Sequence, residues 1–345
     1  MAKRKRKKKQ KYSIGLIPLI SISIVFAVVI IITLNSSLKI SFIPTWSKIS
    51  DKIYETVAAY AFQLPSSGKE ETNSHKKPLS KGEVEVHIID VGQGDSILIK
   101  TPTKVVLIDS GENDKGKTVV DYLISQKIQN IDILIATHPH SDHIGGMDYV
   151  IDNMNINKIL MPKLPDEIVP TTRVYTDVLQ SIAKKGLKIT NPTPQIQYDL
   201  GNGATLKVIA PLAEFKSLNE MSIVTRLDFG ESSFLFTGDI EKFSEKSIVE
   251  SKSDVDVDVL DTAHHGSRGS NTADFLAEVT PKLATISLGK DNDYGHPHKE
   301  AVERISKYCN ILRTDLNGNI VLKTDGKTIW ATMQNGEEIS IDATK

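Results

Sequence analysis

A buried strand that ends in a cluster of histidines constrains this chain more than any other feature. The segment "IDILIATHPHSDHIGG", residues 131–146, opens with an apolar run and ends with three histidines and an aspartate within six positions. A short apolar run bounded by turn residues is typical of a strand buried in a sheet. Metal-capable side chains at such a strand end favour a layered α/β domain with its site in the loops.

Strand and helix patterns alternate along the rest of the body. Strands are predicted at "EVEVHIID", "SILIKT", "KVVLIDSG", "ATLKVIAP", "SIVTRLDFG", "SSFLFTGD" and "KTIWATM", and helices at "GKTVVDYLISQK", "RVYTDVLQSIAKKG", "IEKFSEKSIVES", "TADFLAEV" and "KEAVERISKY". No second linker interrupts this pattern, so we expect one α/β domain over residues 82–345, with sheets inside and helices outside. The GxG of "DVGQGDS" is not a dinucleotide fingerprint, because a strand follows it rather than a helix.

The first 81 residues predict a membrane attachment. Residues 1–12 form a basic tail, and without it 34 of the 42 Lys and Arg remain against all 43 acidic residues. Residues 13–34 are uncharged and reach the roughly 20 apolar residues that span a bilayer. The positive-inside rule places the tail in the cytoplasm and the body outside the cell membrane. A cleaved signal peptide is the alternative, but the run is long for one and no small-x-small site follows.

Residues 35–81 predict a stalk helix followed by a polar linker. The single cysteine, Cys309, excludes a disulfide framework within the chain and a Cys-rich zinc site. No disulfide-linked partner is implied.

Seven of the nine histidines fall into three groups. Each group follows a predicted strand end, where α/β domains usually assemble their sites. The groups are His138/His140/His143, His264/His265 and His296/His298.

The first histidine group has the spacing of a two-metal site. His138 and His140 are two apart and can point the same way from an extended segment. Asp142 and His143 follow at a turn and can serve a second metal, while Asp239, at the end of "FLFTGD", can bridge the two. Imidazole and carboxylate ligands suit Zn, Mn or Fe. Two such ions activate water and hold a phosphate for in-line displacement.

These motifs resemble the metallo-β-lactamase superfamily, and more narrowly the hydrolase domain of ComEC-family DNA-uptake proteins. The resemblance rests on "HIIDVGQGDSILIKT", "VLIDSG", "THPHSDHIGG", "NEMSIVTRLDFGESSFLFTGDIE", "DVLDTAHHGSRGSN", "SLGKDNDYGHPH" and "RTDLNGNIVLKTDG", and covers residues 83–333. It implies an αββα sandwich with the site at one edge.

The resemblance also implies a role for each residue of the site. His138 and His140 would bind the first metal, and Asp142, His143 and His264 the second, with His265 as the alternate for His264. Asp239 would bridge the metals, and the catalytic set would comprise Asp142, His265 and His296. Asp109 would orient these groups through hydrogen bonds. Asp95 would support the site with it, and Gln93 and Asp95 would tie the first strands to the site, although a role as plain turn residues explains both equally well.

One departure from the superfamily concerns the first metal. Its members usually carry another histidine shortly before the "GD" strand, where this chain has Asn219 and Ser222. The first metal would then be held less tightly, which favours Mn over Zn. Asn219 is a candidate substrate contact.

Three further residues are candidates for substrate contact. His296 can act as a general acid toward the leaving group or bind a phosphate; the alternative is a loop histidine that bonds the backbone. Ser267 and Arg268 follow the "HHG" turn, and a guanidinium holds phosphate through a bidentate pair of hydrogen bonds.

The sequence therefore predicts a membrane-anchored hydrolase with two divalent cations, Zn or Mn, that cleaves nucleic acid as a phosphodiesterase. ComEC-like proteins have many membrane spans and this chain has one, so DNA transport would need separate channel components. Alternatives are hydrolysis of another extracellular ester (a wall-polymer phosphodiester, a phosphorylcholine ester or a lactone) and a non-catalytic DNA-binding accessory protein.

Overall fold

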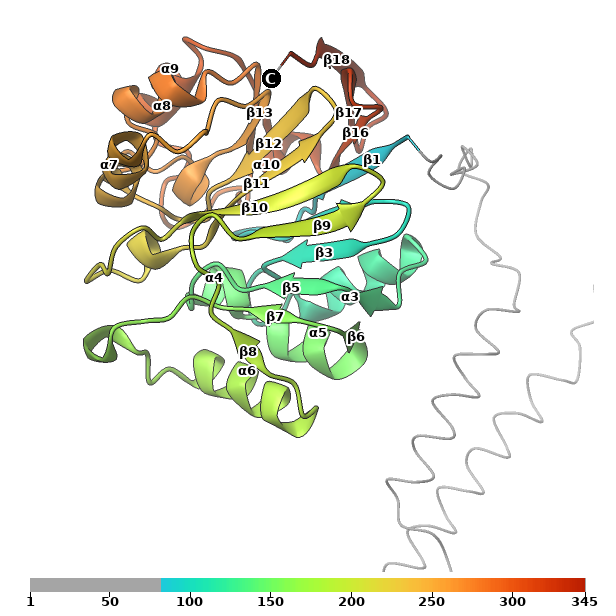
Figure 1. Cartoon of the computed structure of the whole chain (residues 1–345), viewed down its shortest axis with the longest axis vertical. Coiled ribbons are helices and arrows are strands. Elements are labelled where there is room, and N and C mark those ends of the chain that lie inside the picture. Colours follow the sequence, from blue (N-terminus) through green and yellow to red (C-terminus); the bar gives the residue numbers. More distant parts are fainter. Residues whose placement is uncertain (1–81, 345) are drawn as a thin grey trace, which may run out of the picture. The chain divides into compact units, whose positions relative to one another are not determined.

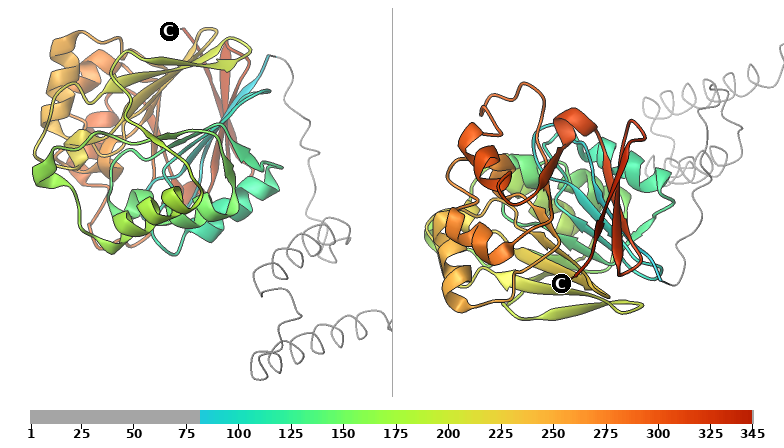
Figure 2. Two further views of the ribbon diagram at one scale, coloured as in Figure 1. Left: turned by 60° about the horizontal axis from the view of Figure 1, so that its bottom comes forward. Right: turned by 90° about the horizontal axis from the view of Figure 1, so that it is seen from above.

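Two β-sheets face each other between layers of helices in the computed structural model, which describes residues 82–344 (Figures 1 and 2). The larger sheet runs in the spatial order β18 (Glu338–Asp342), β17 (Thr328–Met333), β16 (Ile320–Thr324), β1 (Val84–Ile88), β2 (Ile97–Lys100), β3 (Val105–Ile108), β5 (Ile133–Ile135), β7 (Ile159–Leu160) and β8 (Ile189–Thr190). The smaller sheet runs in the order β15 (Asn310–Arg313), β14 (Leu283–Ile286), β13 (Val259–Asp261), β12 (Ser232–Phe236), β11 (Val224–Phe229), β10 (Ala204–Ala210) and β9 (Gln197–Gly201). Strands β4 (Asn130–Ile131) and β6 (Asn155–Ile156) pair separately.

The helices are distributed over both outer faces of this sandwich. The α-helices are α3 (Gly116–Ser125), α4 (Ser141–Ile144), α5 (Met147–Asn153), α6 (Arg173–Lys184), α7 (Lys242–Ser251), α8 (Ala273–Val279), α9 (Lys299–Ile305) and α10 (Thr314–Asn317). Short 3₁₀ turns occur at η1 (Asp166–Ile168), η2 (Asn219–Met221) and η3 (Ala263–Gly266). Figure 1 shows α7, α8 and α9 on the side of the smaller sheet, and α3, α5 and α6 on the side of the larger one.

Alternation along the central strands explains the layers. In β12, "SSFLF", every residue is buried, yet the side chains divide between two cores. Phe234 and Phe236 lie in the core between the sheets, whereas Leu235 packs toward the helices, because successive strand residues point to opposite faces. The same division separates Val106 from Leu107 in β3. The predicted α/β architecture, with sheets inside and helices outside, is confirmed.

Parallel strands in both sheets lead toward the histidine loops. Strands β3, β5, β7 and β8 are parallel neighbours in the larger sheet, and β12 to β15 are parallel neighbours in the smaller one. The carboxyl ends of β5, β12 and β13 continue into residues 136–143, 237–240 and 262–266. Ligands of open α/β sheets usually bind outside such carboxyl ends.

A glycine in the β1–β2 loop sets how closely that loop approaches the first histidine cluster. Gly94 has a φ of +110°, and a Cβ there would lie 1.9 Å from the carbonyl oxygen of Asp142. The backbone N–H of Asp95 donates to that same oxygen at 3.1 Å. Only glycine allows this contact, which ties the first hairpin to α4.

Two buried carboxylates hold the amino ends of helices in the smaller half. Glu220, in η2, accepts hydrogen bonds from the backbone N–H groups of Glu241, Phe243 and Ser244 at 2.7–3.2 Å, at the start of α7. Glu245, within α7, accepts from Thr272 just before α8. Carboxylates at helix amino ends satisfy donors that have no partner within the helix.

The helix predictions at α3, α6, α7, α8 and α9 are confirmed, but the short strands β6, β7 and β8 and the edge strands β9 and β18 were missed. Strands β9 and β18 lie at sheet edges, and most of their residues are at least partly exposed. The predicted tail (1–12), anchor (13–34) and stalk with linker (35–81) lie outside the described residues. Within residues 82–344, no helix is both long and apolar enough to cross a bilayer.

Candidate metal centre

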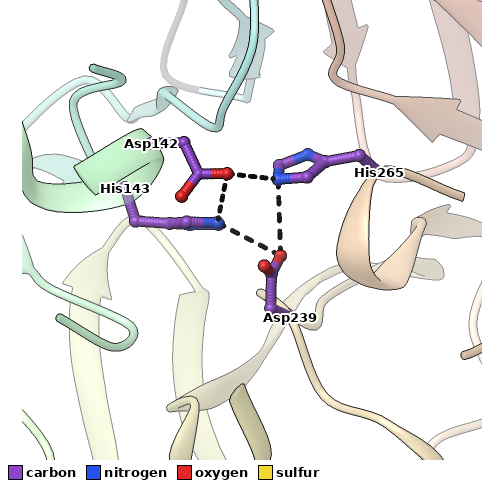
Figure 3. A group of neighbouring side chains, drawn as sticks. All are labelled: Asp142, His143, Asp239 and His265. Atoms are coloured by element: carbon purple, nitrogen blue, oxygen red, sulfur yellow. Dashed lines mark hydrogen bonds and ion pairs between the residues drawn. The ribbon is translucent and has the colours of Figure 1, made fainter. Parts of the chain in front are cut away.

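Four side chains from three separate segments converge at the edge of the sandwich. Asp142, His143, Asp239 and His265 each offer a ligand atom, and these atoms all lie within 4.8 Å of one another (Figure 3). The Nε2 of His143 is 3.1 Å from Oδ1 of Asp239, and the Nε2 of His265 is 3.2 Å from Oδ2 of Asp142. Asp142 and His143 lie in α4, Asp239 lies in the loop after β12, and His265 lies in η3, so these residues come together only in the folded chain. We call these four residues the second group.

A first group shares the carboxylate of Asp239. It consists of His138, His140 and Asp239, whose ligand atoms also lie within 4.8 Å of one another. The Nε2 of His138 lies 3.0 Å from Nδ1 of His140 and 3.7 Å from Oδ2 of Asp239. Asp239 thus turns Oδ1 toward the second group and Oδ2 toward the first.

Hydrogen bonds from behind fix the imidazoles of the larger-sheet side. The Nδ1 of His143 lies 2.8 Å from Oδ2 of the fully buried Asp109. Asp109 also accepts hydrogen bonds from the backbone N–H and the hydroxyl of Thr137, at 2.9 and 2.6 Å. The hydroxyl of Ser222 lies 3.2 Å from Nδ1 of His138. Such partners set the orientation of a metal-ligating ring.

His265 has equivalent partners. Its Nδ1 lies 2.8 Å from the carbonyl oxygen of Ser287 and 3.4 Å from Oδ1 of Asp95. Gln93 accepts a hydrogen bond from the backbone N–H of Gly289 at 3.3 Å, which ties the β1–β2 loop to the segment after β14. The structure therefore gives Asp95 and Gln93 contacts beyond those of plain turn residues.

The carboxylates dominate the electrostatics of the cluster. Burial disfavours the charged form of His143, but Asp239, Asp142 and Asp109 outweigh burial and raise its pKa well above the usual value. The same balance, led by Asp239 and Asp95, raises the pKa of His265. Despite burial, His143 and His265 hold the pKa of Asp239 well below its usual range. A metal cation would take the place of the protons on these imidazoles, because ligands bind in their deprotonated form.

The residues present fit divalent cations. The Nε2 of His143 and the Oδ1 of Asp239 are buried, and neither forms a hydrogen bond even though they approach each other to 3.1 Å. Buried polar atoms are rarely left without a partner, and such an atom points to an ion or water. Imidazole and carboxylate donors suit Zn, Mn or Fe.

The structure distinguishes the two histidines of the "HHG" turn. His265 is buried and belongs to the second group, whereas His264 is 21% exposed and lies at the rim. The expectation that His264 completes the set with Asp142 and His143 does not fit this geometry; the alternate, His265, occupies that position. The Nδ1 of His264 instead lies 3.2 Å from Oε1 of Glu241.

Asn219 stands beside His264 and Glu241 at the rim of the cluster. Its Nδ2 lies 3.4 Å from Oε1 of Glu241 and 3.5 Å from Nδ1 of His264, while its Oδ1 is buried without a partner. Its backbone carbonyl accepts a hydrogen bond from the hydroxyl of Ser222 at 2.7 Å. These two residues therefore line the place where the superfamily pattern has a histidine.

His296 lies over the "HHG" turn, with ring centroids 5.5 Å from His264 and 6.1 Å from His265. Burial and these two imidazoles lower its pKa to about 4, which makes it neutral at pH 7. A neutral ring suits hydrogen bonding to a substrate better than proton donation as a general acid.

The other two candidate substrate contacts, Ser267 and Arg268, directly follow the "HHG" turn. Ser267 is buried, and its hydroxyl accepts a hydrogen bond from the backbone N–H of Gly269. Arg268 is exposed; its backbone N–H donates to Nδ1 of His298, and its carbonyl accepts from the guanidinium of Arg304.

Two acidic residues near the cluster were missed in the sequence. Glu241 contacts His264. Its position two residues after Asp239 in "GDIE" is the sequence feature that could have indicated a place near the cluster. Asp261 is fully buried at the end of β13, where burial and Asp95 raise its pKa well above the usual value. It is one of three aspartates in "VDVDVLD", and nothing in the pattern distinguishes it as the one beside the cluster.

Residues 89–290, more than half of the chain, match the family described as "Metallo-beta-lactamase superfamily". The chain belongs to this superfamily. Its members are metallo-hydrolases, and the His/Asp cluster described above suits a binuclear metal site. The resemblance predicted from the motifs is confirmed.

Relatives include proteins named for competence. ComE operon protein 3 of Bacillus subtilis is 31% identical over 268 residues, which cover 70% of this chain and 33% of that protein. Competence protein ComA of Neisseria gonorrhoeae is 29% identical over 69% of this chain and 32% of that protein. Exodeoxyribonuclease WalJ of Streptococcus pneumoniae is 37% identical over 54 residues, 16% of this chain and 20% of that protein. The chain spans about a third of the length of the competence relatives it matches.

Proposed function

We propose that this protein is a metal-dependent phosphodiesterase that cleaves nucleic acid with two divalent cations, Zn or Mn. The observation that carries the proposal is the division of Asp239 between two groups of imidazoles. Two cations held on either side of one carboxylate would form the kind of two-metal site that hydrolyses phosphodiesters by in-line displacement.

The two cations would polarise the phosphoryl group and supply a nucleophilic water when bound. The protein keeps the ligands in place. Asp109 fixes the ring of His143, and Ser287 fixes that of His265, so that each Nε2 faces the cluster. The β1–β2 loop packs against Asp142 through Gly94, which holds the carboxylate of Asp142 next to His265.

We assign the substrate phosphate to the open side of the cluster. His264 and His296 lie there, and the neutral ring of His296 can donate one hydrogen bond to a phosphate oxygen. Arg268 is exposed beyond the same turn and can supply charge-assisted hydrogen bonds, and Asn219 and Ser267 complete the candidate contacts.

Nucleic acid is favoured over other phosphodiesters by the relatives, one of which is named as a competence protein and one as an exodeoxyribonuclease. The body is acidic, and broad electrostatic binding to duplex DNA relies on clustered Lys and Arg. We therefore propose that affinity is concentrated at the metal centre, and that the enzyme acts on strands that reach the open side of the cluster.

We also propose that residues 13–34 anchor the protein in the cell membrane, with the hydrolase body on the extracytoplasmic side. The uncharged run and the basic residues before it support this arrangement. DNA that enters a separate uptake channel would then be within reach of the metal centre.

The test uses the full chain in detergent, incubated with linear DNA and Mn²⁺ or Zn²⁺, with Asp142→Ala in parallel. Cleavage by the unaltered chain, lost in Asp142→Ala and on chelation, is expected. If two ions bind per chain and neither single- nor double-stranded DNA is cleaved, the nuclease proposal is wrong. The search then moves to wall-polymer phosphodiesters, phosphorylcholine esters and lactones.

A further inference from the structure

The first group has only two imidazoles, His138 and His140, beside the shared carboxylate of Asp239. We propose that His264 is its missing third imidazole: the two histidines of the "HHG" turn divide between the metals, His265 on the second and His264 on the first. This inference rests on the proposed two-metal function and concerns which residues bind each ion.

The two oxygens of Asp239 separate the imidazoles into pairs. Oδ2 lies 3.7 Å from Nε2 of His138 and 3.6 Å from Nε2 of His264. Oδ1 lies 3.1 Å from Nε2 of His143 and 3.6 Å from Nε2 of His265. His264 therefore shares its carboxylate oxygen with the first group, and His265 shares its own with the second.

The other nitrogen of His264 has the partner expected of a metal ligand. Its Nδ1 lies 3.2 Å from Oε1 of Glu241, as Nδ1 of His143 lies beside Asp109. A ligating histidine usually donates its second N–H to a carboxylate or carbonyl oxygen, which leaves the lone pair of Nε2 for the metal. Glu241 accepts a further hydrogen bond from Nδ2 of Asn219, and so acts as a positioning residue.

The backbone of the turn is built to present both rings. His264 and His265 have φ values of +53° and +52°, a left-handed conformation that is uncommon for residues other than glycine. The backbone N–H of His264 donates to the carbonyl of Gly238 at 3.0 Å, which pins the turn beside Asp239. Strained backbone of this kind is concentrated at functional sites.

The position of His264 also accounts for the departure at Asn219. Asn219 occupies the place where the superfamily pattern has a histidine, and its amide bonds Glu241, the residue that orients His264. His264 is partly exposed, so on this assignment it would hold the first ion from the solvent side. The first group thereby regains three imidazoles from a different segment of the chain.

The experiment titrates the full chain, stripped of metal by a chelator, with Co²⁺. Bound ions are counted, and visible absorption bands report the ligands of each ion. The unaltered chain is expected to bind two ions. His264→Ala and His138→Ala should weaken the same ion by about 10-fold or more and change the same band, whereas His265→Ala and Asp142→Ala should weaken the other. Glu241→Gln should weaken only the first ion, by about 10–100-fold.

His298→Ala is the matched control, because this nearby imidazole bonds the backbone of Arg268 rather than the cluster. It should leave both ions unchanged. The inference is overturned if His264→Ala keeps both ions at full affinity, or if it alters the band that Asp142→Ala alters. If the unaltered chain binds fewer than two ions, the two-metal function is wrong and this inference falls with it. If the unaltered chain binds two ions and only the His264→Ala result differs from expectation, this inference alone is wrong.

Discussion

At the scale of single residues, the metal centre depends on which nitrogen of each ring faces inward. His143, His264 and His265 each turn Nε2 toward Asp239 and place Nδ1 beside an oxygen. For His143 that oxygen belongs to Asp109, a buried carboxylate that belongs to neither the first nor the second group. Its contribution is therefore separable from that of the ligands.

Asp109→Asn should weaken the second metal by about 10–100-fold while the protein stays folded. Asp109 has a φ of +55°, and asparagine tolerates this conformation better than most residues. The amide can no longer offer the charged oxygen that holds the N–H of His143. Competition with a chelator measures the affinity, and circular dichroism monitors the fold.

Asp325→Asn serves as the control for that substitution. Asp325 is an exposed turn residue whose carboxylate accepts hydrogen bonds from the backbone of Lys327 and Thr328. Equal metal affinity in Asp109→Asn and Asp325→Asn would contradict a role for Asp109 in orienting His143.

The sequence was sufficient for residues whose role follows from spacing, and insufficient where the role depends on the folded geometry. His138, His140, Asp142, His143 and Asp239 were predicted as a cluster and lie together. The choice between the histidines of the "HHG" turn required the burial of each ring and its distances to the carboxylates, which no composition or periodicity reveals.

At the scale of elements, close packing between loops decides whether the cluster can form. Gly94→Ala should weaken metal binding by at least about 10-fold and lower the free energy of unfolding by about 1–3 kcal/mol, since a Cβ there would meet the backbone of Asp142. Chelator competition and denaturant unfolding measure the two effects.

Gly186→Ala provides the matched control for steric contact. Gly186 also has a positive φ, of +66°, but a Cβ there meets nothing within 4 Å. It should cost about 1 kcal/mol of conformational strain and leave metal binding unchanged. Similar loss of metal in both variants would show that general destabilisation, and not the contact with Asp142, is responsible.

The buried cap between α7 and α8 predicts a pH effect on stability. Burial, opposed by hydrogen bonds from Thr272 and Asn271, raises the pKa of Glu245 to about 6. Between the unfolded value of about 4.5 and about 6, the folded protein binds more protons, so this group lowers stability as pH rises through that window. The loss amounts to about 2 kcal/mol.

Glu245→Gln should remove that part of the pH dependence. Denaturant unfolding at pH 4.5 and pH 7 gives the difference for each protein, and Glu250→Gln on the same helix, where Glu250 pairs with Lys246 in solvent, is the control. A difference as large in Glu245→Gln as in Glu250→Gln would rule out Glu245 as the cause.

The element patterns also show where sequence periodicity stops being informative. Central strands such as β12 and β13 are buried on both faces and read as apolar runs. The edge strands β9 and β18 contain few buried residues, so their hydrogen-bond partners define them and their composition does not.

At the scale of the whole molecule, the metal centre joins the two sheets. His138, His140, Asp142 and His143 follow strand β5 of the larger sheet, while Asp239 and His265 follow strands β12 and β13 of the smaller one. Ions bound between them would link the two halves of the sandwich. An ion that binds only the folded protein stabilises it by about 2.7 kcal/mol when its concentration is 100 times its Kd.

Removal of metal should therefore lower the Tm of the whole body in one cooperative transition, and addition of Mn²⁺ or Zn²⁺ should restore it. Calorimetry with and without chelator measures the shift. Asp239→Ala is the decisive comparison, because Asp239 lies between both groups and its loss leaves neither complete. Its Tm should no longer respond to chelator. A chelator effect of full size in Asp239→Ala would place the stabilising ion elsewhere in the molecule.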